Sequence, residues 1–113
     1  MDEHIIKAVD YILDFFDKRH VSYEFRGDDE HMIIDLKEYL KLTNEEYEGF
    51  TNGLPKFGFK HSTKWNYYDV YVDEYVKDQY VLEVFSVPNN WVYAVHVWKQ
   101  LKQLKAEEVS GSE

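Results

Sequence analysis

Cysteine is absent from this chain of 113 residues, and several other features that carry chemistry are scarce or missing. Without cysteine there is no disulfide framework, no thiol nucleophile and no thiolate metal site. No stretch approaches the roughly 18 consecutive apolar residues that a membrane-spanning helix needs. The acidic start MDEH lacks the positive charge of a secretory signal. We therefore expect a soluble protein of a reducing, cytoplasmic compartment.

Arginine supplies only two of the 13 basic residues, which disfavours bidentate recognition of phosphates or base edges. The chain has no glycine-rich phosphate loop, and no serine has an adjacent base or oxyanion motif. Its five histidines lack the spacing of metal ligands, such as i and i+4 on one helix. We therefore expect no enzymatic activity, no cofactor and no metal.

One acidic pattern keeps a metal-dependent nuclease open as an alternative. Asp28 or Asp29 precedes the run Asp35-Leu36-Lys37. This order resembles the acid, then acid-x-Lys arrangement of metal-dependent nucleases, where carboxylates hold Mg²⁺ and the lysine orients the attacking water. A turn followed by a strand explains the same residues equally well.

Acidic residues outnumber basic ones by 22 to 13, which gives a formal charge of −9. The charge is uneven, because residues 1–54 carry −8 whereas residues 55–65 carry +3. A surface of negative sign repels phosphate backbones and attracts basic proteins. Aromatic residues make up 18% of the chain, and an excess of this kind favours a contact surface.

The pattern of apolar residues predicts a single α+β domain over residues 1–106 and a flexible acidic tail over 107–113. An N-terminal helix over 3–19 has its apolar residues at helical spacing. Two hairpins, over 21–36 and 67–87, supply an antiparallel sheet of about four to five strands.

The sequence also predicts a short middle helix over 43–52. Thr43 and Glu46 form a capping box at its start, and Asn52-Gly53 ends it. Residues 36–42, just before this helix, fit either a strand or a helix.

The last predicted element is a C-terminal helix packed on the sheet. Its apolar residues have helical spacing: Trp91, Ala94, Val95, Trp98, Leu101 and Leu104. Asn89 or Asn90 would cap its start, and the lysines near its end suit a helix C-terminus. Whether Trp91 and Trp98 belong to the core or to a dimer interface stays open.

The best functional candidate is a set of tyrosines and acids on the second hairpin. Rigid tyrosine rings anchor a partner at low entropy cost, and carboxylates steer and pair with its basic groups. Three aspartates of the first helix add an acidic ridge. The predicted partner-binding residues are Asp10, Asp14, Asp17, Trp65, Tyr67, Asp69, Tyr71, Asp73, Glu74 and Tyr75. The same tyrosines could instead cover a second core face or pair across strands.

Size, negative charge and the lack of catalytic motifs make the chain similar to small acidic inhibitors of microbes and phages, namely anti-CRISPR, anti-restriction and toxin-immunity proteins. The resemblance implies a non-enzymatic protein that binds and inhibits a basic, nucleic-acid-handling protein by mimicking the charge of DNA. The expected partner is a nuclease or another nucleic-acid enzyme, and a homodimer is compatible with the sequence.

The segment PKFGFKHSTKW over 55–65 indicates an alternative function, direct nucleic-acid binding. It interleaves basic and aromatic residues and resembles the RNA-stacking strand of RNA-recognition domains. The alternative site residues are Lys56, Phe57, Phe59, Lys60 and Lys64. The order of helices and hairpins also resembles a winged helix, although its recognition helix and wing would here be acidic and would repel phosphates.

Overall fold

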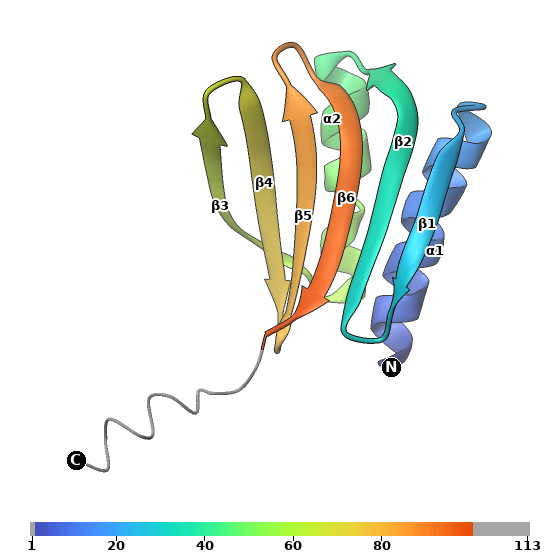
Figure 1. Ribbon diagram of the computed structural model, residues 1–113. Coiled ribbons are helices and arrows are strands. Elements are labelled where there is room, and N and C mark those ends of the chain that lie inside the picture. Colours follow the sequence, from blue (N-terminus) through green and yellow to red (C-terminus); the bar gives the residue numbers. More distant parts are fainter. Residues whose placement is uncertain (1, 101–113) are drawn as a thin grey trace.

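The computed structural model describes residues 2–100, and Figure 1 shows their arrangement. The helical elements are α1 (Glu3–Lys18), α2 (Asn44–Thr51) and the short 3-10 helix η1 (Leu54–Phe57). The strands are β1 (Tyr23–Asp28), β2 (His31–Lys41), β3 (Lys60–Tyr67), β4 (Val70–Lys77), β5 (Tyr80–Val87) and β6 (Trp91–Lys99). The predicted tail over 107–113 and the predicted domain limit at residue 106 lie outside the described residues.

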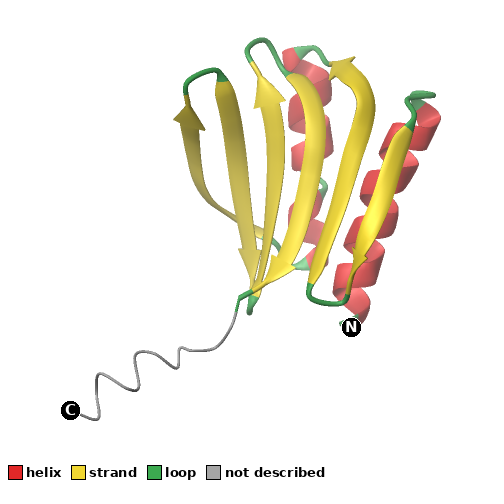
Figure 2. Ribbon diagram, in the orientation of Figure 1, coloured by secondary structure: helices red, strands yellow, loops and turns green. Residues whose placement is uncertain are grey.

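All six strands form one antiparallel sheet in the order β1-β2-β6-β5-β4-β3. β6 therefore lies between β2 and β5, in the middle of the sheet. Both α-helices lie against one face, and no described helix covers the other (Figures 1 and 2). We call these the helix face and the open face. None of the helices within residues 2–100 combines the length and the apolar character required to span a membrane.

The hydrophobic core lies between α1 and the helix face, and the predicted N-terminal helix is confirmed. Asp2 caps α1 by accepting a hydrogen bond from the backbone N–H of His4 at 2.7 Å. The core cluster combines buried residues of α1 and of the central strands, including Ile5, Val9, Ile12, Phe16, Ile34, Leu82, Val84, Val92 and Val95. Fully burying one such side chain contributes about 1.5–3 kcal/mol, so this contact fixes α1 to the sheet.

The predicted middle helix is confirmed as α2, together with its capping box. Thr43 Oγ1 accepts a hydrogen bond from the backbone N–H of Glu46 at 3.0 Å, and the Glu46 carboxylate accepts one from the backbone N–H of Thr43 at 2.9 Å. Residues 36–41, which fitted either element, continue β2 as a strand. The helix pair of a winged helix is therefore not formed.

The predicted C-terminal helix is wrong, because Trp91–Lys99 is the central strand β6. A β-bulge explains the error. Tyr93 is an extra residue in the ladder between β6 and β5, where the register shifts. The insertion separates Trp91 and Ala94, both on the open face, by three positions instead of two. This spacing imitates that of a helix.

Asn89 and Asn90 form the turn between β5 and β6 instead of capping a helix. Both have positive φ, 73° and 61°. Asparagine favours helix N-caps and also tolerates left-handed turn positions, so the residue type alone does not separate the two structures. The helix prediction for Leu101 and Leu104 lies outside the described residues.

The sheet has six strands instead of the four to five predicted from two hairpins. One strand that the prediction lacked is β3, which forms an edge of the sheet and is exposed along all eight of its residues. The register of this edge is interrupted at Ser62, and Lys60 and Lys64 are exposed along it. A turn at Tyr68-Asp69 leads into β4, so the predicted second hairpin corresponds to β4 and β5.

Candidate functional site

The open face of the sheet carries a band of aromatic side chains. Alternation along each strand directs every second side chain to this face, and the register aligns those of neighbouring strands. The aromatic residues of the open face are Tyr39, Trp65, Tyr67, Phe85, Trp91, Tyr93 and Trp98. Tyr39, Trp65 and Tyr67 are 53, 41 and 66% exposed.

Small apolar residues of the open face pair with larger aromatic ones across strands. The pairs are Val72 with Trp65, Val81 with Trp98, and Ala94 with Phe85. The three small residues are 0, 1 and 2% exposed, although no described helix covers them. Aromatic cross-strand pairs stabilise a sheet by about 0.2–1 kcal/mol each. We call the surface formed by these three pairs the aromatic platform.

Two glutamates face each other on the platform. Glu74 of β4 and Glu83 of β5 are register partners, and the Trp98 indole N–H donates a hydrogen bond to the Glu83 carboxylate at 3.1 Å. Burial raises the pKa of Glu83. The Trp98 hydrogen bond opposes this shift, and the charge of Glu74 adds to it. Like charges directly opposite each other destabilise a sheet, so the fold carries this pair at a cost.

Two histidines adjoin Glu83 on the open face. His96 is the register partner of Glu83, and its ring centroid lies 5.7 Å from that of His31. Burial lowers the pKa of His96, and the neighbouring His31 lowers it further. A shallow depression of about 440 Å³ lies among these side chains and reaches Trp98. Protonation of His96 at acidic pH would place positive charge beside its register partner Glu83.

On the helix face, Asp73 of β4 is a buried carboxylate that contacts two side chains. The Tyr47 hydroxyl of α2 donates a hydrogen bond to one oxygen at 2.5 Å, and His61 Nε2 lies 3.0 Å from the other. Burial and the hydrogen bond to Asp73 raise the pKa of Tyr47, so its phenol stays protonated. The Tyr47 proton and the His61 nitrogen are both committed to Asp73, and the cluster ties α2 to β3 and β4.

The predicted set of tyrosines and acids on the hairpin is divided between the two faces. Trp65, Tyr67 and Glu74 lie on the open face, whereas Tyr71, Asp73 and Tyr75 lie on the helix face. Asp73 and Tyr75 are both buried, at 6% exposure. Asp69 lies in the turn between β3 and β4. A partner on the open face would therefore meet only part of the predicted set.

The three aspartates predicted on α1 form a separate surface. All are exposed, and Asp14 forms a salt bridge with Lys18 at 3.1 Å. Asp17 accepts a hydrogen bond from the Tyr23 hydroxyl at 2.9 Å. Because α1 packs against the helix face (Figure 1), all three aspartates lie on the side of the sheet away from the platform.

The residues of the predicted nucleic-acid segment are also dispersed. Phe59 is 0% exposed and belongs to the core, so its ring cannot stack on a base. Phe57 is half-buried, and its ring centroid lies 5.6 Å from that of Tyr11. Lys56, Lys60 and Lys64 are all exposed, and Lys64 also lines a cleft on the helix face. Nucleic-acid binding by the lysines stays a prediction.

The acids of the nuclease pattern have structural contacts. Asp35 forms a salt bridge with Arg26 at 2.8 Å. Asp28 accepts hydrogen bonds from the backbone N–H groups of Glu30 and His31 in the turn between β1 and β2. Over residues 2–100, no three His, Cys, Asp or Glu side chains are grouped to hold a metal ion.

Sequence reasoning missed Glu83, His96 and Trp98, which meet on the open face. Glu83 interrupts the otherwise apolar run QYVLEVFSV, and a charged residue within a central strand is itself a signal, because its burial is costly. His96 and Trp98 could not be found in the same way. Their faces depend on the bulge at Tyr93, which the sequence does not reveal.

Comparison of the chain with protein families, with curated proteins and with solved structures found no match. The functional conclusion therefore rests on the geometry and charge of the chain itself.

Proposed function

We propose that the chain is a non-enzymatic protein that docks its open face onto a basic protein and inhibits it. The aromatic platform supports this proposal, since tryptophan and tyrosine are enriched at interfaces and dominate their binding energy. Trp65 and Tyr67 are exposed at the edge of the platform. The carboxylates of Glu74 and Glu83 would select a partner of positive charge.

The opposed pair of Glu74 and Glu83 is the observation that carries the proposal. Their repulsion and the burial of Glu83 are unfavourable in the free protein. A lysine or arginine of a partner, placed between the two carboxylates, would relieve the repulsion and form charge-assisted hydrogen bonds. The neighbouring Trp98 ring would add a cation–π contact. An unfavourable pair of the free chain thus becomes a favourable contact of the complex.

The net charge of −9 extends the proposal to the kind of partner. Asp10, Asp14 and Asp17 lie away from the platform, so they would contribute to long-range steering without direct contact. Proteins that handle nucleic acids present basic surfaces for phosphates, and the carboxylates would occupy such a surface. We therefore propose a cytoplasmic nuclease or related enzyme as the target, as in anti-CRISPR, anti-restriction or toxin-immunity proteins.

Two variants with equal charge changes test the docking face. Partners are captured from lysate of the source cell, and the affinity of the purified captured protein is then measured. Glu74→Gln with Glu83→Gln should weaken binding at least roughly tenfold, because it removes the opposed charge pair of the docking face. Asp10→Asn with Asp14→Asn removes the same charge from α1 and should mainly slow association at low salt.

Equal losses in the two double variants, or no loss in either, would contradict docking through the open face. The captured enzyme should also lose activity when the chain is added. If the enzyme binds the chain but keeps its activity, the proposed interface stands and the proposed inhibition is wrong. If the chain instead retards single-stranded oligonucleotides in a gel-shift assay at low salt, direct nucleic-acid binding is favoured.

A further inference from the structure

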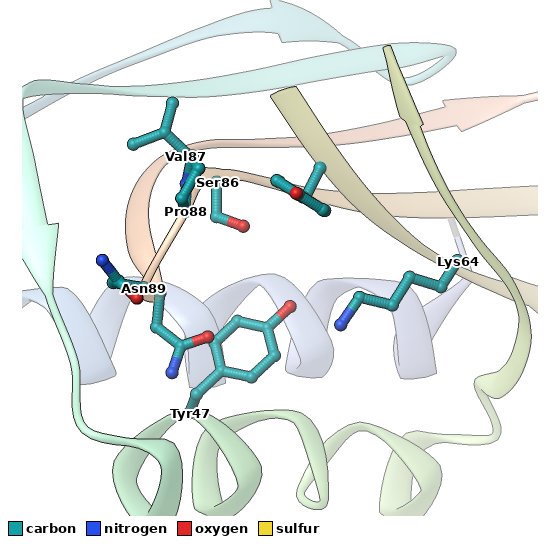
Figure 3. A pocket seen from close by; sticks show the side chains of 8 residues that line it. Tyr47, Lys64, Ser86, Val87, Pro88 and Asn89 are labelled. Atoms are coloured by element: carbon teal, nitrogen blue, oxygen red, sulfur yellow. The ribbon is translucent and has the colours of Figure 1, made fainter. Parts of the chain in front are cut away.

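A cleft of about 280 Å³ lies on the helix face, between α2, β3 and the turn that joins β5 to β6 (Figure 3). Its walls include Tyr47, Lys64, Ser86 and Asn89. The volume lies close to the lower end of the range for small-molecule sites, about 300–1,000 Å³. The cleft is separated from the proposed docking face by the sheet itself, so the two can be tested independently.

Ser86 places a buried hydroxyl in this cleft. The residue is 7% exposed, and its side chain makes no hydrogen bond to any residue within 2–100. In Figure 3 the hydroxyl points into the cleft, toward the Tyr47 ring. A buried polar group without a partner is costly, which indicates that the missing acceptor comes from outside residues 2–100.

Lys64 supplies a positive charge to the same space. Its side chain extends from β3 across the cleft, and its ammonium group points toward Tyr47 (Figure 3). The register partner of Lys64 on β4 is Asp73. That carboxylate instead contacts Tyr47 and His61, and over residues 2–100 Lys64 forms no salt bridge.

Within residues 2–100 the Tyr47 hydroxyl makes its hydrogen bond with Asp73, and neither Ser86 nor Lys64 donates a hydrogen bond to it. The Tyr47 ring forms a wall of the cleft. Ser86 and the exposed Lys64 are therefore two donors that line one cleft and have no acceptor within residues 2–100. An anionic oxygen is the group that satisfies both, because a charged acceptor strengthens each hydrogen bond.

We propose that this cleft binds a small molecule through a carboxylate or phosphate group, whose oxygens accept hydrogen bonds from the Lys64 ammonium and the Ser86 hydroxyl. The Tyr47 ring and the Pro88 side of the turn provide an apolar wall for the rest of the molecule. The nearby negative charge of Asp73 limits the ligand to a single anionic group.

An NMR titration of the isotope-labelled full chain tests this site. The probes are inorganic phosphate, acetate and benzoate, with benzamide as the uncharged counterpart of benzoate. At least one anion should produce saturable shifts at the backbone amides of Ser86 and Asn89, and benzamide should produce none. A stronger response to phosphate than to acetate and benzoate, or the reverse, identifies which anionic group the cleft prefers.

Variants separate the site from general surface charge. Lys64→Met keeps the aliphatic stem and should weaken anion binding at least roughly tenfold. Lys60→Met, on the same strand but outside the cleft, should leave binding unchanged. Ser86→Ala should weaken binding several-fold, and it should leave the thermal unfolding midpoint unchanged or raise it, because it removes an unpartnered hydroxyl.

Three results would overturn the proposal. The first is the absence of saturable shifts with all three anions at millimolar concentrations. The second is an equal loss of binding in Lys60→Met and Lys64→Met. The third is a lower unfolding midpoint for Ser86→Ala, which would show that the hydroxyl already has a partner within the fold.

Discussion

Asp73→Ala removes the one acceptor that Tyr47 and His61 share, and we expect it to lower the free energy of unfolding by about 3 kcal/mol. Loss of a hydrogen bond to a charged group costs about 1.5–3 kcal/mol, and the partly buried Tyr47 hydroxyl left without an acceptor costs about 1–2 kcal/mol more. The His61 side chain is 48% exposed and can turn to water, so it adds little.

A double-mutant cycle isolates the hydrogen bond from the other effects of the substitution. Tyr47→Phe alone should cost about 2 kcal/mol, because Asp73 then keeps only His61. The combined variant should lose about 1–2 kcal/mol less than the sum of the two single losses. Asp69→Ala, in the exposed turn between β3 and β4, is the control and should change stability by less than about 0.5 kcal/mol.

Urea denaturation followed by tryptophan fluorescence measures these differences, provided that the dependence of the free energy on urea stays constant among variants. A loss of about 3 kcal/mol is a large part of the 5–15 kcal/mol typical of a domain, so the shift of the midpoint is easily resolved. Additive losses, with a coupling below about 0.5 kcal/mol, would refute the idea that Asp73 and Tyr47 stabilise the fold through their mutual contact.

Three further perturbations have expected outcomes. Burial raises the pKa values of several tyrosines, namely Tyr11, Tyr23, Tyr47, Tyr75 and Tyr93. As the pH rises, the unfolded chain therefore loses these protons before the folded chain does. The free energy of unfolding, measured by urea denaturation at a series of pH values, should fall above about pH 10, and it should fall less steeply in Tyr47→Phe. A free energy of unfolding that stays constant with pH would contradict these pKa shifts. Glu83→Gln should raise the free energy of unfolding at neutral pH by up to about 1 kcal/mol, since it removes the repulsion from Glu74; a loss of stability in urea would contradict this. Thr43→Ala should cost about 1 kcal/mol in thermal unfolding, since it removes the capping bond to Glu46, and an unchanged midpoint would show that the cap is dispensable.

The two helices were predictable because their signals are local. The helical spacing of Ile5, Val9 and Ile12 defines α1, and the capping box that begins at Thr43 defines the start of α2. Signals of this kind depend on a few neighbouring residues and do not require knowledge of which strands pair.

The open face could not be predicted in the same way, because it depends on register. A turn at Tyr68-Asp69 places Tyr67 on the open face, while Tyr71 and Asp73 face the helices. In a strand, a shift of one residue exchanges the two faces, so an error in the position of a turn moves a side chain to the other side of the sheet. The bulge at Tyr93 has the same effect within β6.

The position of β6 sets the order in which the sheet can be completed. Within residues 2–100, β6 is the last strand of the sheet in sequence, yet it joins the β1–β2 hairpin to the β3–β4–β5 meander. During synthesis each half can pair within itself, but β2 and β5 keep open edges until Trp91–Lys99 has been made. Its pairing with β2 spans most of the described chain, a contact that slows folding and leaves partly formed sheets open to association with other chains. A ribosome that stalls before β6 would thus carry two half-sheets, each with one edge that only this strand can close.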